Sequence, residues 1–243
     1  MSKLKLLTAS IGLAFAASAA AAPVELYIEQ NVASNAADDG TYTTEAGATI
    51  ETSEDGYVYI GFDDQGWLAA GYGYSFGLTD ALDLNLYGEL GKWETGEEML
   101  LEAILAYNFN ENFSVFGGYG YNRSGQVFEN LNDNAINTNQ FIAGTSMTFG
   151  LFSLDYKYTH ENSDGTSGYI RDGGFAYFTQ DSFRTNEHEV ILSAQIDDFT
   201  PYVKYTYFNT AEGELSGSGP VGAPLHPAME NDSIWTLGLA YQF

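Results

Sequence analysis

The sequence predicts an all-β fold, a transmembrane antiparallel up-and-down β-barrel of twelve strands, with ten strands as the alternative. Three observations favour this fold. Polar and apolar residues alternate along segments of strand length, short and long connections alternate between the segments, and aromatic residues are abundant. Aromatic residues make up 15% of the chain and Gly contributes 27 residues. No apolar run beyond the N-terminal region is long enough for a membrane-spanning helix.

The first residues are expected to form a targeting segment. Lys3 and Lys5 precede the short apolar stretch Leu6–Ala17, and small residues follow it. This order is typical of a secretory signal peptide, and the apolar stretch is too short to span a membrane. We therefore expect residues 1–21 to be removed and residues 22–243 to form one outer-membrane barrel domain.

Twelve segments show the alternation expected of strands. Segment 81–93, for example, places four leucines on one face and Asp83 and Glu89 on the other. The predicted strands are 24–32, 41–52, 56–63, 67–77, 81–93, 98–109, 113–123, 138–149, 152–161, 186–196, 200–209 and 232–243. If Ser53–Asp55 is not a turn, segment 33–66 is one long external loop and the barrel has ten strands.

The connections between the predicted strands alternate in length. The short ones are Gly77–Asp80, Asn110–Asn112, Gly150–Leu151 and Asp197–Phe199. The long ones are Ser124–Asn137, Asn162–Asn186 and Asn209–Asn231. In transmembrane barrels the short turns are periplasmic and the long loops external. Residues 211–231 are rich in Gly, Pro and Ser, and are expected to fold inward or to lie mobile at the mouth.

The last predicted strand alternates most clearly and carries a sequence signal. Residues 236–243 resemble the terminal assembly signal of Gram-negative outer-membrane β-barrels, through Thr236, Gly238, Tyr241 and the final Phe243. The resemblance implies location in the bacterial outer membrane and insertion by the barrel-assembly machinery. It also implies contact with outer-membrane lipid and lipopolysaccharide. The alternative is a secreted β-sandwich, whose strands would alternate in the same way.

The polar faces of the strands predict an acidic lumen, because the apolar faces would meet lipid. The predicted pore-lining residues are Glu45, Asp83, Glu89, Glu98, Glu102, Asp155, Lys157, Glu189 and Lys204. Negative walls attract cations and repel anions, so we expect passive diffusion of small hydrophilic solutes with a preference for cations. Small residues on the same faces are expected to leave room for water; they are Gly71, Gly73, Gly118, Gly120, Gly144 and Ser146. In the alternative reading, the acids are simply solvated groups.

Two inward lysines and three aromatic residues have two readings each. Lys157 and Lys204 either pair across the lumen with Asp155, Glu89 or Glu102, forming a constriction, or make ordinary salt bridges within the lumen. The aromatic residues either stack on sugar rings or belong to the membrane girdle and loop packing; they are Trp67, Tyr87 and Trp93.

Composition excludes several classes of function. Eight basic residues against 33 acidic ones exclude a nucleic-acid partner, since phosphate binding needs clustered Lys and Arg. The absence of Cys excludes disulfides and cysteine-ligated metals. No EF-hand, phosphate-loop or zinc-protease motif is present, so we expect no cofactor, no metal and no enzymatic activity. His160 and Ser163 lie three residues apart and therefore on opposite strand faces, too far apart for nucleophilic catalysis.

In size and strand number the chain is similar to the small twelve-stranded porins of the oligogalacturonate type. That resemblance implies a basic, arginine-lined lumen for acidic sugars. The sequence has only three Arg, so an acidic-sugar substrate is not expected. A non-conducting surface barrel is the second hypothesis, with loops 162–185 and 211–231 binding a partner protein or matrix.

Overall fold

The computed structural model describes residues 23–33, 42–93, 96–125, 135–171, 175–211, 215–218 and 231–243. The predicted signal peptide, residues 1–21, lies outside the described residues. Among the described residues, no helix has the length and apolar character needed to cross a membrane.

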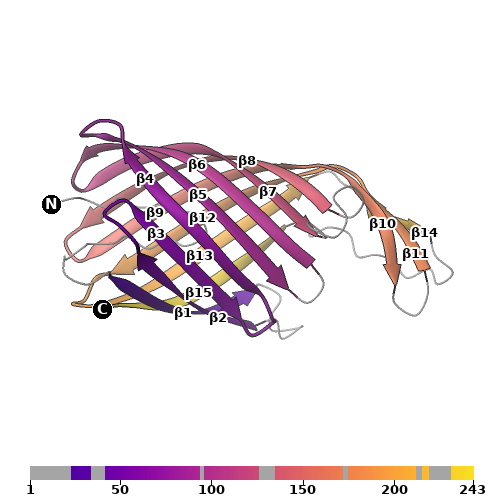
Figure 1. Ribbon diagram of the computed structural model, residues 1–243, viewed down its shortest axis with the longest axis horizontal. Coiled ribbons are helices and arrows are strands. Elements are labelled where there is room, and N and C mark those ends of the chain that lie inside the picture. Colours follow the sequence, from indigo (N-terminus) through magenta and orange to yellow (C-terminus); the bar gives the residue numbers. More distant parts are fainter. Residues whose placement is uncertain are drawn as a thin grey trace.

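Twelve antiparallel strands close into a barrel (Figure 1), as the sequence predicts. They are β1 Val24–Ala33, β2 Tyr42–Glu51, β3 Gly56–Asp63, β4 Leu68–Gly77, β5 Leu82–Trp93, β6 Gly96–Asn110, β7 Phe113–Gly125, β8 Ala135–Phe149, β9 Phe152–Ser163, β12 Phe183–Ala194, β13 Phe199–Ala211 and β15 Asn231–Gln242. Strand β1 closes the barrel by pairing with both β2 and β15. The turn after β2 is closed by a hydrogen bond from Thr52 N to Gly56 O of 2.8 Å, so the ten-strand alternative is wrong.

Three short strands were not predicted. Strands β10 Thr166–Arg171, β11 Phe175–Gln180 and β14 Leu215–Ser218 form a separate antiparallel sheet in the order β10-β11-β14. Figure 1 shows this sheet projecting beyond the barrel, at the end opposite the start of β1 and the C-terminus. The prediction of segments 162–185 and 211–231 as loops is therefore wrong where these strands form. An inward fold is wrong for β14, because it pairs with β11 in the projecting sheet.

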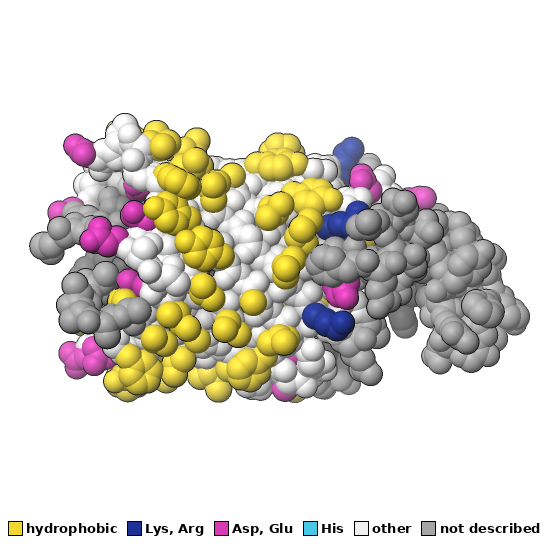
Figure 2. All heavy atoms as spheres, viewed as in Figure 1, with side chains coloured by type: hydrophobic (Ala, Val, Ile, Leu, Met, Phe, Trp, Pro, Cys, Tyr) yellow, Lys and Arg dark blue, Asp and Glu magenta, His cyan; other side chains and the backbone are white. Residues whose placement is uncertain are grey.

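The outer wall of the barrel is apolar and the inner wall is polar, the reverse of a water-soluble protein. On β15, the side chain of Leu237 is 60% exposed, whereas its neighbour Thr236 is fully buried and donates to Asn31 Oδ1 at 2.6 Å. Leu101, Leu105 and many other large apolar residues are likewise exposed. Figure 2 shows apolar side chains spread over the middle of the wall and carboxylates towards its two ends. Such a surface suits lipid.

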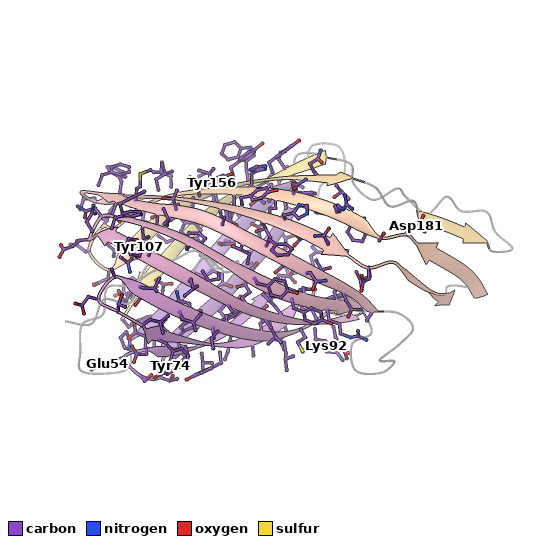
Figure 3. All side chains as sticks on the ribbon, turned by 90° about the horizontal axis from the view of Figure 1, so that it is seen from above. Glu54, Tyr74, Lys92, Tyr107, Tyr156 and Asp181 are labelled. Atoms are coloured by element: carbon purple, nitrogen blue, oxygen red, sulfur yellow. The ribbon has the colours of Figure 1, made fainter. Side chains whose placement is uncertain are left out.

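Aromatic pairs gather where strands meet the short turns. The Phe149 and Phe152 rings stack across one turn with centroids 5.9 Å apart. At another turn, Tyr241 lies 4.7 Å from both Phe199 and Phe243. Tyrosine and phenylalanine favour the boundary between lipid and water, so these pairs mark one edge of the apolar band. Figure 3 shows Glu54 at this end of the barrel and Lys92 at the opposite end.

Inward tyrosines cover glycines on neighbouring strands. A Cβ added to Gly73 would meet the ring of Tyr57, and one added to Gly238 would meet the ring of Tyr202. The expectation that lumen glycines leave room for water is therefore wrong. Larger neighbours occupy the space over all five: Tyr87 over Gly71, Tyr57 over Gly73, Ile104 over Gly118, Gln140 over Gly120, and Phe116 over Gly144.

Part of the barrel interior is apolar. Ile104, Ala106, Phe116 and Ile142 form a buried cluster on β6, β7 and β8. Tyr27, Tyr59 and Tyr202 belong to a second cluster on the far side of the barrel. Side chains therefore fill part of the lumen.

The tyrosine–glycine packing predicts that Gly73→Ala destabilises the barrel by about 1–3 kcal/mol, because the added methyl overpacks against Tyr57. Urea unfolding of the barrel refolded in lipid vesicles measures this. Gly77→Ala on the same strand is the matched control, since its Cβ would meet only Asp83 Oδ1 at 3.9 Å. Equal stability of the two variants would contradict the packing argument.

Candidate functional site

A cavity of about 300 Å³ lies inside the barrel, lined by side chains from strands around its circumference. Six of the lining residues are glutamates and one is lysine. The lining consists of Glu45, Tyr59, Trp67, Glu89, Glu98, Leu100, Glu102, Asn122, Gln140, Lys157, Thr159, Glu161 and Glu187. The alternation of the strands brings these residues together, because those within strands lie on the inward faces, and Trp67 directly precedes β4.

Aromatic donors hold three of the carboxylates. The Tyr27 hydroxyl donates to Glu45 Oε1 at 2.6 Å, and the Trp67 indole Nε1 donates to Glu98 Oε1 at 2.9 Å. The Tyr87 hydroxyl donates to Glu89. These donors are uncharged, so they fix the positions of the carboxylates without cancelling their negative charge.

Two other carboxylates of the lining have different surroundings. Gln140 Nε2 donates to Glu161 Oε1 at 2.8 Å, between β8 and β9. Glu102 on β6 is only 9% exposed. Its Oε2 has no hydrogen-bond partner among the described residues. A buried acceptor in this state has lost water without gaining a protein donor, which is costly.

Both inward lysines pair with glutamates along the wall. Lys157 Nζ lies 3.5 Å from Glu189 Oε1, its direct neighbour across the β9–β12 ladder. Lys204 Nζ lies 3.3 Å from Glu29 Oε2. The other oxygen of this carboxylate, Oε1, accepts a hydrogen bond from the Tyr202 hydroxyl at 2.6 Å. The expected partners Asp155, Glu89 and Glu102 are wrong for these ion pairs. Register and barrel closure place other glutamates closer.

The structure brings together five of the nine predicted pore-lining residues around the cavity. They are Glu45, Glu89, Glu98, Glu102 and Lys157. The other four do not line it. Glu189 and Lys204 stand in the two ion pairs, Asp83 accepts from Asn108 Nδ2 at 2.8 Å, and Asp155 is buried opposite Ser146 and Ile191 in the sheet register.

Sequence reasoning missed several lining residues. Glu187 shares a strand face with Glu189, so the alternation alone was sufficient to find it. Gln140 and Asn122 carry no charge and gave no comparable signal. Tyr59 was missed because tyrosines were assigned to the lipid-facing girdle, whereas this one is 1% exposed inside the barrel. Trp67 lines the cavity, while Tyr87 and Trp93 do not.

The cavity offers ion binding by carboxylates and contact with aromatic rings. Within the described ranges, no group of three or more His, Cys, Asp or Glu side chains is arranged to hold a metal ion. The negative charge of the cavity comes from its glutamates, four of which accept from neutral donors, and Lys157 is the opposing charge in the lining.

No family model and no curated protein matches the sequence. Solved structures do match. The NanC porin aligns with a TM-score of 0.66 at 11% identity, covering 89% of this chain and 98% of that one. The KdgM porin aligns at 0.58 and 9% identity, covering 90% and 99%. The KdgM porin in complex with disordered oligogalacturonate aligns at 0.56 with the same identity and coverage. The chain therefore has the closed-barrel fold of these porins.

The Lys157–Glu189 pair predicts a clear loss of stability in Lys157→Met. Both side chains are 8% exposed, so the variant leaves a buried carboxylate without its ion pair, at a cost of about 3 kcal/mol. Urea unfolding in vesicles measures the loss, and adding Glu189→Leu should restore most of it. In the control Lys92→Met, the lost pair with Glu97 has a lysine side chain that is 70% exposed, and the change should be at most about 1 kcal/mol. Similar losses in both single variants would contradict this assignment.

Proposed function

We propose that this protein is an outer-membrane porin that lets small hydrophilic solutes diffuse passively and prefers cations. The observation that carries the proposal is the cavity lining, with six carboxylates and one ammonium inside a barrel whose outer wall is apolar. Fixed negative charge in a narrow passage favours cations over anions. The porin fold of the structural neighbours supports a channel.

The acidic lining argues against an anionic solute. One solved neighbour is the KdgM porin in complex with oligogalacturonate, an acidic sugar. In this chain the six lining carboxylates would repel such a solute. The shared fold therefore does not imply that this protein takes the same ligand as its structural neighbour.

The histidine and serine of β9 support a channel rather than a lipid hydrolase. His160 Nδ1 lies 2.8 Å from Asn186 Oδ1, whereas the buried Ser163 pairs its hydroxyl with Thr138 at 2.8 Å. The two side chains thus make separate contacts and do not form a nucleophile–base couple.

The charge argument predicts that Glu89→Gln with Glu102→Gln lowers the preference for K⁺ over Cl⁻. Both glutamates line the cavity, and glutamine keeps their size and the carbonyl acceptor for Tyr87. The measurement is the reversal potential of single channels in a planar bilayer under a KCl gradient.

The matched control is Glu54→Gln with Asp55→Asn, which removes two exposed carboxylates from the turn after β2. We expect the control to keep the wild-type reversal potential. An unchanged potential in the cavity variant would remove these two glutamates from the conduction path. No conductance from a folded wild-type barrel would overturn the porin proposal.

We also propose that Thr236, Gly238, Tyr241 and Phe243 guide assembly by the barrel-assembly machinery into outer-membrane lipid and lipopolysaccharide. The proposal extends to removal of residues 1–21 as a signal peptide. Phe243 is 70% exposed, and its N–H donates to Val24 O at 2.9 Å beside the closing strand pair.

This assembly role predicts that Phe243→Ala lowers the amount of folded barrel in cells several-fold while the purified variant still refolds in vesicles. The ring contacts Tyr241 on the outer surface, so its loss removes little packing from the interior. Heat-modifiable migration in gels measures the folded fraction in both settings. Phe149→Ala is the control, because Phe149 is another exposed aromatic beside a short turn. Equal losses in both variants would contradict a signalling role.

The projecting sheet favours one second candidate function. Strands β10, β11 and β14 extend beyond the barrel mouth and, within the described part of the chain, pair with one another and with no barrel strand. A surface barrel that binds a partner protein or matrix through this sheet is the alternative if the folded barrel does not conduct.

A further inference from the structure

The internal cavity has a charge that its own groups do not balance. The donors on Glu45 and Glu98 are a phenol and an indole, both uncharged. Lys157 is the lysine in the lining, and its ammonium pairs with Glu189, which does not line the cavity. The uncompensated negative charge of this lining attracts a mobile cation into the cavity.

Glu102 supplies a second, independent indication of a ligand. Its side chain lines the cavity and is 9% exposed, and Oε2 has no hydrogen-bond partner among the described residues. Buried carboxylate oxygens are normally satisfied, so this acceptor would gain a hydrogen bond from a donor that reached it from the cavity. An N–H donor on a cation would satisfy both its hydrogen bond and its charge.

The remaining lining selects among cations. Tyr59, Trp67 and Leu100 add aromatic and aliphatic surface beside the glutamates. A bare metal ion gains nothing from Leu100, whereas an amine with a carbon chain can contact Leu100 and the rings while its ammonium meets Glu102. A cavity of about 300 Å³ holds about ten waters and so has room for a small diamine.

We infer that this cavity is a binding site for small organic cations, of the primary amine or guanidinium class. The inference rests on the proposed function for the passage of such a cation through the barrel, but binding in the cavity stands without conduction. Glu102 is the residue that meets the N–H donors, and Trp67 and Leu100 contact the carbon chain.

Titration calorimetry on the refolded mature barrel at low salt tests the inference. The probe is 1,4-diaminobutane, with 1,4-butanediol as its neutral counterpart and ammonium chloride as a cation without a carbon chain. We expect saturable binding of the diamine, weaker binding of ammonium, and no binding of the diol. Glu102→Gln should weaken diamine binding about tenfold through loss of a charge-assisted hydrogen bond. Glu54→Gln, which removes an exposed turn carboxylate, should leave it unchanged.

The outcomes separate this inference from the porin proposal. A barrel that conducts K⁺ but binds the diamine no better than the diol overturns the inference and leaves the porin intact. A barrel that binds the diamine in a Glu102-dependent way but does not conduct supports the inference and overturns the porin. Equal weakening of diamine binding by Glu102→Gln and Glu54→Gln would show general attraction to the negative charge of the barrel and would overturn the assignment of the cavity as the binding site. The wild-type titration decides diamine binding even if a variant fails to fold.

Discussion

The structure depends on one constraint: a closed barrel in lipid must turn its apolar side chains outward and find partners for its polar ones inside. Closure by the β1–β15 ladder removes the free strand edges that lipid could not satisfy. The exposed leucines of β6 and the fully buried Thr236 of β15 both follow from it. The same constraint gathers charged groups in the interior, because the acids of the strands are excluded from the lipid face.

Inward tyrosines have two roles inside the barrel, packing and hydrogen bonding. Their rings fill the space over glycines on neighbouring strands, as Tyr202 does over Gly238, and their hydroxyls donate to carboxylates, as Tyr202 does to Glu29. The Tyr27 and Tyr59 hydroxyls also pair with each other at 2.6 Å, which ties β1 to β3. Lysines have a different effect, since Lys157 and Lys204 neutralise the glutamates that they contact. The balance between neutral and charged donors therefore decides where negative charge survives, and around the cavity it survives on most glutamates.

The sequence predicted the twelve barrel strands because alternation and turn length are local signals. Strand parity likewise predicted inward positions for Glu45, Glu89, Glu98 and Glu102. It did not identify the partners of the lysines, since Lys204 and Glu29 are 175 residues apart and meet only through barrel closure. Parity also says nothing about which tyrosines face inward when both faces carry them.

The small size of the cavity is what gives its charge an effect. A sphere of about 300 Å³ is about 8 Å across, close to the Debye length of about 8 Å at physiological salt. No ion inside is therefore screened from the glutamates of the wall. In a wide water-filled pore the same carboxylates would act only on ions near the surface. Tyr59, Trp67 and Leu100 line the same cavity and thus contribute to selectivity, because they confine a passing solute to the space where the glutamates act.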